Sequence, residues 1–304
     1  MNQRQCIIIG SGPAGYTAGI YCRRAGIDTL LLSGYLSGGQ LTETSTIENF
    51  PGFPQGINGT ELMDRMREQA VAFGLEIKDA TVESVDFSSA EPVLHLDSKE
   101  SVSCKTLIIA TGARPRHLGI PGEGKFAGRG VSYCATCDGF FFRNRTVAVV
   151  GGGDTAAEEA LYLSSLAAKV YMIVRKPYLR ASEIMRKRVE EKQNLEALFS
   201  TTVAEVCGEN KVDYLRINTP EGEKELKVDG LFPAIGHDPV SGLFSPAIKT
   251  NESGYIITGP GSTATNIPNV FAAGDVADPR YRQAVTAAAT GCMAAMDVEH
   301  YLMS

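Results

Sequence analysis

The stretch CIIIGSGPAGYTAGIYCRRAGIDTLLL, from Cys6 to Leu32, decides the fold. A β-branched run, a glycine turn, a helix of small residues and a second apolar run follow one another, as is typical of a βαβ unit. In its GSGPAG motif, Gly10 allows the tight turn, Gly12 lets the backbone approach a pyrophosphate, and Gly15 lets the helix pack on the strand. Because the helix N-terminus then faces an anion, we expect this motif to bind a dinucleotide.

The ribose contact of this first unit is not assigned by the pattern. Dinucleotide-binding units normally carry an acidic residue about 20 positions after the glycines, where it accepts hydrogen bonds from the ribose hydroxyls. Here the second strand ends in LLLSG, so Ser33 stands near that place.

A second unit of the same kind begins about 140 residues later, in TVAVVGGGDTAAEEALYLSSLAAKVYMIVRK (Thr146–Lys176). Its pattern predicts a strand, a glycine turn, a helix from Asp154 to about Leu166, and another strand. The motif reads Gly151-x-Gly153-x-x-Ala156, and the fingerprint tolerates alanine in the third place. Two such units predict two dinucleotide sites in an α/β protein.

The second unit ends in VRKPYLR rather than in an acid. Arg175, Lys176 and Arg180 therefore stand where a 2′-phosphate needs cations, which favours NADPH over NADH. The alternative is an ordinary solvated basic loop. Lysine keeps the charge of arginine but lacks its bidentate fork, so Lys176 softens the expected preference.

Composition limits the remaining possibilities. The chain has 304 residues, enough for about two domains. Its 29 basic and 35 acidic residues give a net charge of −6 without long single-sign runs, so we expect no binding to nucleic acid. No apolar stretch approaches the about 18 residues needed to cross a membrane, and the first residues carry no targeting pattern. We therefore expect a cytoplasmic protein.

The cysteines divide into two groups. Five of the seven stand alone in the sequence, which is poor material for an extracellular disulfide framework. Cys134 and Cys137 stand three positions apart in VSYCATCDGFF. Such a pair can close a disulfide, supply half of a metal site, or consist of two buried thiols.

Several motifs together resemble the low-molecular-weight thioredoxin reductases of the flavoprotein disulfide reductase group. The resemblance runs from the first strand to the last helix, and its order and spacing are highly specific. The matching stretches are IIIGSGPAG, GGQLTETSTIENFPGFPQGI (38–57), LIIATGARPR (107–116), CATCDG (134–139), VVGGGDTAAEEA, NVFAAGDV (269–276) and YRQAVTAAATGCMAA.

The resemblance implies two Rossmann-like nucleotide-binding domains. The FAD domain is expected at residues 1–113 and 242–304, and an inserted NADPH domain that carries the cysteine pair at residues 114–241. The implied FAD residues are Gly10, Gly12, Pro13, Ala14, Gly15, Gln40, Asn49, Ala110, Thr111, Gly112, Gly274, Asp275, Arg282, Gln283 and Ala284. The implied NADPH residues are Gly151, Gly153, Asp154, Thr155, Ala156, Arg175, Lys176 and Arg180.

With two nucleotide sites expected, the cysteine pair is interpreted as a redox-active disulfide. A zinc site needs two further ligands, but there is no second Cys-x-x-Cys and the four histidines are scattered. Inert thiols do not explain Asp138, which follows at once and is a candidate acid/base, although it could also be an ordinary turn residue. By resemblance, Cys137 meets the flavin and Cys134 attacks the partner disulfide.

The expected activity is NADPH-dependent reduction of the thioredoxin disulfide. NADPH, FAD and a dithiol/disulfide couple each handle two electrons, so they form a consistent relay. The resemblance also implies a homodimer. The alternatives are a reductase of the same build that serves another dithiol protein, such as a peroxiredoxin-like or glutaredoxin-like acceptor, and a flavin redox sensor without turnover. We expect no bound metal.

Overall fold

The chain crosses twice between two units, through the short paired strands β7 (Ala113–Pro115) and β15 (His237–Pro239). The computed structural model describes residues 2–44 and 46–304. Unit 1 is Met1–Arg114 with Asp238–Ser304, and unit 2 is Pro115–His237. Unit 2 is therefore an insertion within the sequence of unit 1.

Apolar runs form the central strands of unit 1. Ile7, Ile8 and Ile9 are all buried, as is typical of a parallel strand covered on both faces. Within the described residues, the sheet has seven strands in the order β3-β2-β1-β6-β5-β4, with β16 also pairing β6. The strands are β1 (Asn2–Ile9), β2 (Thr29–Leu32), β3 (Glu76–Lys78), β4 (Val82–Asp86), β5 (Val93–Leu96), β6 (Ser101–Ile109) and β16 (Val270–Ala272).

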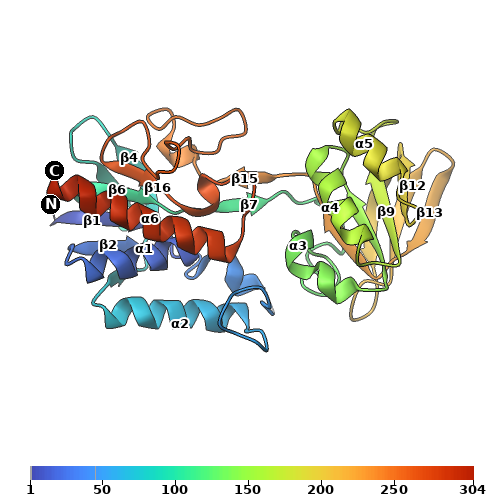
Figure 1. Ribbon diagram of the computed structural model, residues 1–304, viewed down its shortest axis with the longest axis horizontal. Coiled ribbons are helices and arrows are strands. Elements are labelled where there is room, and N and C mark those ends of the chain that lie inside the picture. Colours follow the sequence, from blue (N-terminus) through green and yellow to red (C-terminus); the bar gives the residue numbers. More distant parts are fainter. Residues whose placement is uncertain (1, 45) are drawn as a thin grey trace. The chain divides into compact units, whose positions relative to one another are not determined.

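The helices of unit 1 are α1 (Pro13–Arg24), α2 (Gly59–Ala72) and α6 (Ala284–Met303). Helix α1 contacts both α2 and α6 (Figure 1). A Cβ atom on Gly291 would lie 2.2 Å from the carbonyl oxygen of Ala14, so only glycine permits α6 to approach α1 this closely. This explains the small-residue pattern of the last helix.

Unit 2 contains two sheets. A parallel sheet has the order β10-β9-β8-β14, and an antiparallel sheet has the order β11-β12-β13. The strands are β8 (Thr146–Val150), β9 (Lys169–Val174), β10 (Leu195–Phe199), β11 (Thr202–Cys207), β12 (Tyr214–Thr219), β13 (Gly222–Lys227) and β14 (Gly230–Pro233), and the helices are α3 (Ala135–Asp138), α4 (Asp154–Ser164) and α5 (Glu183–Glu190).

The predicted α/β class with two βαβ units is confirmed. One helix bound differs from the expectation, because α4 ends at Ser164 rather than near Leu166. The last helix, α6, begins at Ala284. Arg282 has a left-handed φ of 48°, which prevents the helix from starting earlier. Among the residues that the structure describes, no helix is long and apolar enough to cross a membrane.

Candidate active site

The first glycine loop joins β1 to α1 with almost no space around two of its glycines. Gly10 has a left-handed φ of 109°, and a Cβ there would lie 2.2 Å from the Ala110 carbonyl oxygen. A Cβ on Gly15 would lie 1.9 Å from the Gly10 carbonyl oxygen. Gly12, by contrast, has no heavy atom within 4 Å of its Cβ position, so the loop is open on this side. The loop is thus tightly packed at Gly10 and Gly15 and leaves open space for a ligand at Gly12.

Two further chain segments lie beside this loop because of the strand order. The Ala110 N–H donates to the Ile9 carbonyl (2.8 Å), which places the Ala110–Gly112 turn next to Gly10. A Cβ on Gly274 would lie 3.0 Å from the Ala14 Cβ. The predicted segments therefore meet at the carboxyl ends of the parallel strands β1, β6 and β16, where open α/β sheets bind ligands.

Asp275 carries an unsatisfied polar atom at this edge. Its Oδ1 is buried and has no hydrogen-bond partner within the described residues. Burial, followed by the nearby Asp278 carboxylate, raises the pKa of Asp275 from 3.8 to about 7. A buried oxygen of this kind calls for a donor such as a ligand hydroxyl. The site thus fits a hydroxyl-rich dinucleotide.

Gln40, Asn49 and Gln283 come from distant parts of unit 1. The Gln40 amide, in the short helix η1 (Gly39–Glu43), donates to the Ala113 carbonyl. The Asn49 amide donates to Gln283 Oε1 (3.2 Å), and Gln283 caps α6. The fold thus places these three predicted residues on segments that are linked to the turn after β6 or to the start of α6.

The second glycine loop has the same construction in unit 2. Gly151 has a φ of 155°, and a Cβ there would lie 2.6 Å from both the Ala156 Cβ and the Ala234 carbonyl oxygen. Gly153 has no heavy atom within 4 Å of its Cβ position. Alanine in the third place of the motif therefore fits only because glycine stands in the first.

The basic segment after β9 is attached to this loop. The Arg180 and Ala181 N–H groups both donate to the Gly152 carbonyl (2.7 and 3.1 Å). Arg175, Lys176 and Arg180 are exposed, and within the described residues no carboxylate pairs with them. Three unpaired cations beside a glycine loop suit a 2′-phosphate.

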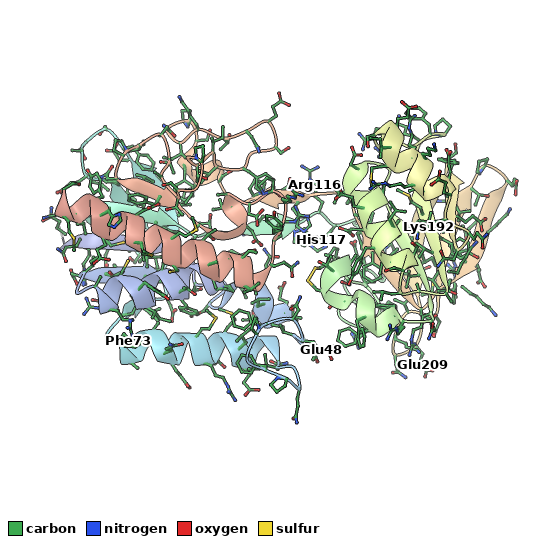
Figure 2. The ribbon with its side chains drawn as sticks, in the orientation of Figure 1. Glu48, Phe73, Arg116, His117, Lys192 and Glu209 are labelled. Atoms are coloured by element: carbon green, nitrogen blue, oxygen red, sulfur yellow. A yellow bond between two sulfur atoms is a disulfide. The ribbon has the colours of Figure 1, made fainter. Side chains whose placement is uncertain are left out.

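Cys134 and Cys137 form a disulfide with a Cα–Cα distance of 5.3 Å (Figure 2). Cys134 caps the short helix α3, and its Sγ accepts a hydrogen bond from the Cys137 N–H (3.2 Å). A Cβ on Gly139 would lie only 3.0 Å from the Tyr162 ring, so glycine lets this segment pack against α4. The disulfide therefore lies in the same unit as the second glycine loop.

Ser132 is a site residue that the sequence did not reveal. Its Oγ accepts a hydrogen bond from the Cys134 N–H (3.1 Å). Burial raises the pKa of Asp138, and a hydrogen bond with Ser132 partly opposes this rise. Ser132 thus links the first cysteine to the candidate acid.

An exposed aromatic pair follows the disulfide. Phe140 and Phe141 are 56% and 44% exposed, and the Arg143 guanidinium lies 5.6 Å from the Phe140 ring centroid. Large exposed apolar side chains of this kind mark surfaces that contact other proteins. Their position directly after CATCDG was the only signal in the sequence.

A buried carboxylate also lies next to the cysteine segment. Glu123 is 4% exposed and accepts hydrogen bonds from the Leu118 and Gly119 N–H groups (2.9 and 2.8 Å) and from the Tyr133 hydroxyl (3.0 Å). The Tyr133 hydroxyl lies 2.8 Å from Nδ1 of His117, in the segment that follows β7 (Figure 2). Glu123 thereby fixes that segment to the residue before Cys134.

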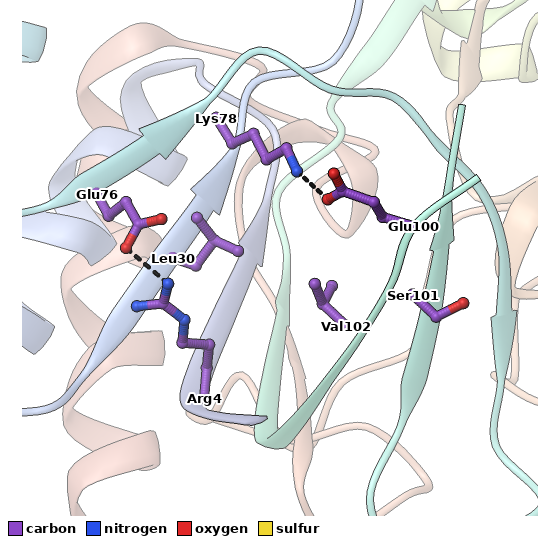
Figure 3. Close-up of a pocket in the computed structure, with 7 residues that line it drawn as sticks. All are labelled: Arg4, Leu30, Glu76, Lys78, Glu100, Ser101 and Val102. Carbon is purple, nitrogen blue, oxygen red and sulfur yellow. Dashed lines mark hydrogen bonds and ion pairs between the residues drawn. The ribbon is translucent and has the colours of Figure 1, made fainter. Parts of the chain in front are cut away.

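One depression in unit 1, with a volume of about 200 Å³, is lined by Arg4, Leu30, Glu76, Lys78, Glu100, Ser101 and Val102. Its charges pair with one another, since Arg4 binds Glu76 (2.7 Å) and Lys78 binds Glu100 (Figure 3). It therefore offers a ligand no unpaired charge. In the part of the chain that the structure describes, no three His, Cys, Asp or Glu residues are grouped to hold a metal ion.

Comparison with known proteins gives concordant matches over the whole chain. The family described as pyridine nucleotide-disulphide oxidoreductase matches residues 4–291. Thioredoxin reductase 1 of Saccharomyces cerevisiae is 49% identical, over 100% of this chain and 99% of the relative. The solved thioredoxin reductase from Giardia duodenalis is 38% identical, with a TM-score of 0.95 and full coverage of both chains. That from Streptococcus pyogenes is also 38% identical, with a TM-score of 0.94 over 99% of this chain and 98% of that chain.

Proposed function

The chain belongs to the pyridine nucleotide-disulphide oxidoreductase family, and from this premise we propose that it reduces the disulfide of thioredoxin with electrons from NADPH. The observation that carries the proposal is the Cys134–Cys137 disulfide, which lies in the same unit as a glycine loop with three exposed cations beside it. The net reaction converts NADPH, a proton and a disulfide into NADP⁺ and a dithiol.

Unit 1 is assigned to FAD and unit 2 to NADPH. The unsatisfied Oδ1 of Asp275 and the open side of Gly12 support the first assignment. Arg175, Lys176 and Arg180 support the second, because the loop that carries them is hydrogen-bonded to Gly152. When bound, FAD would supply the two-electron chemistry that couples oxidation of NADPH to reduction of the Cys134–Cys137 disulfide.

The two cysteines then carry the electrons to the protein substrate. Reduction of the Cys134–Cys137 disulfide by two electrons gives two thiolates, which become a dithiol when they bind protons. A thiolate at Cys134 attacks the thioredoxin disulfide and displaces one of its sulfurs. Cys137 next attacks the mixed disulfide, restores the Cys134–Cys137 bond and releases the second thioredoxin sulfur. The Cys137 N–H that points at Cys134 Sγ favours a thiolate there, which supports Cys134 as the attacking residue.

Asp138 is assigned as the acid/base of this exchange. Burial raises the pKa of its carboxyl group, so the group holds a proton to a higher pH than an exposed aspartate does. It can therefore protonate the leaving thiolate and accept the proton when the disulfide forms again. Ser132 holds the backbone of Cys134 beside it.

The partner surface and the oligomeric state belong to the same proposal. Phe140 and Phe141 offer an apolar docking surface beside the cysteines. Helix α6 presents an exposed stripe that includes Val285, Met293 and Met296, which suits contact with a second copy of this chain. A homodimer and a cytoplasmic location are expected on this assignment.

An assay with NADPH, thioredoxin and a chromogenic disulfide tests the proposed function. Turnover that requires thioredoxin supports it. Turnover only with a peroxiredoxin-like or glutaredoxin-like protein would move the assignment to another acceptor. A protein that binds FAD and NADPH but reduces no dithiol protein would instead be a redox sensor, and no specific contact among the described residues favours that function.

A further inference from the structure

The first βαβ unit lacks the acidic residue that normally binds the adenosine ribose. Strand β2 ends at Leu32, and Ser33 follows it at the place of that acid. A serine hydroxyl carries no charge, so by itself it is a weaker partner for ribose hydroxyls than a carboxylate. A carboxylate that fills this role would lie in a different part of unit 1.

The neighbouring strand places a carboxylate at this position. Strand β3 runs parallel to β2, with Leu32 opposite Lys78. The pairing continues past both strands, because the Ser33 N–H donates to the Lys78 carbonyl (3.1 Å). Asp79 therefore lies beside Ser33, and the Ser33 hydroxyl donates to Asp79 Oδ1 at 2.8 Å. Ser33 is only 4% exposed, so the hydroxyl that holds Asp79 is itself fixed.

This pair is attached to the first glycine loop. The Gly10 N–H donates to the Leu32 carbonyl (2.8 Å), and the Ser11 hydroxyl donates to the Ser33 carbonyl (3.0 Å). Ser11 Oγ in turn accepts a hydrogen bond from the Gly38 N–H (2.9 Å). The Asp79 carboxylate thus stands at the same sheet edge as the loop that faces the pyrophosphate.

The charge of Asp79 is available to a ligand. Asp79 is exposed, and within the described residues its carboxylate accepts a hydrogen bond only from Ser33. The adjacent Lys78 does not neutralise it, because the Lys78 ammonium pairs with Glu100 (Figure 3). An ionised carboxylate has about four acceptor positions, so several remain for ribose hydroxyls.

We propose that Asp79, held in place by Ser33, binds the adenosine ribose hydroxyls of FAD and replaces the missing acid at the end of β2. Asp79 is then a cofactor-binding residue and Ser33 a positioning residue. This inference rests on the proposed assignment of FAD to unit 1. It differs from a purely structural role, in which the Ser33–Asp79 bond only joins two strand ends.

The test is a titration of the FAD-free protein with FAD, followed by the loss of flavin fluorescence. Asp79→Ala removes a charged hydrogen-bond acceptor and is expected to raise the Kd for FAD about ten- to hundred-fold. Asp64→Ala is the matched control, because it removes an exposed carboxylate from α2 of the same unit and is expected to leave the Kd unchanged.

A ligand variant separates a ribose contact from a structural effect. FAD with a 2′-deoxyadenosine moiety is expected to bind the unmutated protein more weakly than FAD does. The Asp79→Ala variant is expected to bind the two ligands with equal affinity, because the contact between Asp79 and the ribose 2′-hydroxyl is already lost. Ser33→Glu in the Asp79→Ala background returns an acid to the end of β2 and is expected to restore most of the FAD affinity.

An unchanged Kd for Asp79→Ala would overturn the inference, as would a variant that still discriminates between the two ligands as the unmutated protein does. In both cases tight FAD binding by the unmutated protein would leave the proposed function standing. If the unmutated protein binds no FAD at all, the proposed function fails together with this inference. The thermal unfolding of each FAD-free variant shows whether its fold is intact.

Discussion

The Asp154 carboxylate accepts a hydrogen bond of 2.9 Å from the backbone N–H of Ser182. Asp154 begins α4, and Ser182 precedes α5, so one bond closes the basic loop over the glycine motif. This bond lowers the pKa of Asp154 below 3.8. The residue after the second motif glycine therefore shapes the loop that carries Arg180, in addition to any contact with a ligand.

Arg180→Ala is expected to reduce the preference for NADPH over NADH. Loss of a charge-assisted contact to the 2′-phosphate is expected to lower kcat/KM for NADPH by the equivalent of about 1.5–3 kcal/mol of binding free energy. The kcat/KM for NADH is expected to change little. Steady-state kinetics with both nucleotides measure the ratio. Arg188→Ala, on the exposed side of α5, is the control. Equal efficiency with both nucleotides in the unmutated protein would remove the phosphate assignment.

Asp275→Asn is expected to stabilise the FAD-free protein at neutral and alkaline pH. Because the folded-state pKa is raised from 3.8 to about 7, the folded state binds more protons than the unfolded state between these values, and stability falls as pH rises through them. At about pH 8 the variant is expected to gain as much as about 4 kcal/mol in unfolding free energy, and below about pH 4 nothing.

Denaturant unfolding at several pH values checks this prediction, with Asp64→Asn, at an exposed carboxylate of α2, as the control. Adding FAD is expected to reduce the difference, since a bound hydroxyl would satisfy Oδ1 of Asp275. A difference that does not vary with pH would contradict the assigned cause.

Replacing both Cys134 and Cys137 by Ser is expected to separate electron entry from electron exit. The glycine motif of unit 2 is untouched, so NADPH is expected still to reduce the bound flavin, which loses its visible absorbance. Thioredoxin reduction is expected to stop, because no disulfide remains to accept and transfer the electrons. Full thioredoxin turnover by this variant would exclude the pair from the reaction.

Asp138→Asn is expected to lower kcat for thioredoxin reduction about 10²- to 10⁴-fold, the usual contribution of a general acid/base. The raised pKa of Asp138 predicts that the protonated form persists above the usual range and is lost as pH rises further. The pH profile of the unmutated enzyme is expected to show this falling limb, and the Asn variant to lack it. A variant that is slower but has an unchanged profile would point to a structural role.

Met296→Glu is expected to dissociate the proposed homodimer. Met296 is 49% exposed on the stripe of α6 that also contains Val285 and Met293, and a charge there disfavours burial against a second copy. Light scattering after size-exclusion chromatography measures the mass of each form. Ile184→Glu, an exposed apolar side chain on α5 of unit 2, is the control. A monomeric unmutated protein would refute the dimer.

The sequence was sufficient to predict the structure where the pattern of residues is local. Glycine spacing and apolar periodicity predicted both βαβ units, because the tight contacts of Gly10 and Gly151 leave no other residue possible. Contacts between distant strands were not predictable. Strand β3 has only three residues, so its pairing with β2, and hence the position of Asp79 beside Ser33, has no periodic signal.

The same limit applies to the cysteine site. The spacing of Cys134 and Cys137 was visible in the sequence, but the role of Ser132 depends on a backbone hydrogen bond formed by a turn. The unsatisfied oxygen of Asp275 depends on how deeply the folded chain buries it, which composition does not reveal. Residue identity suggested some of the candidate site residues, but the contacts of each one depend on tertiary packing.

The insertion of unit 2 into unit 1 has a consequence for the order of folding during synthesis. The two ends of unit 2 meet, since the Arg116 N–H donates to the Gly236 carbonyl (3.0 Å), so this unit is a closed loop that can fold while the ribosome is still translating. Strand β16 and helix α6, which complete the sheet and helical layer of unit 1, emerge only afterwards. Until these last segments have been synthesised, α1 and β6 of the nascent chain expose the apolar surface that α6 and β16 later cover.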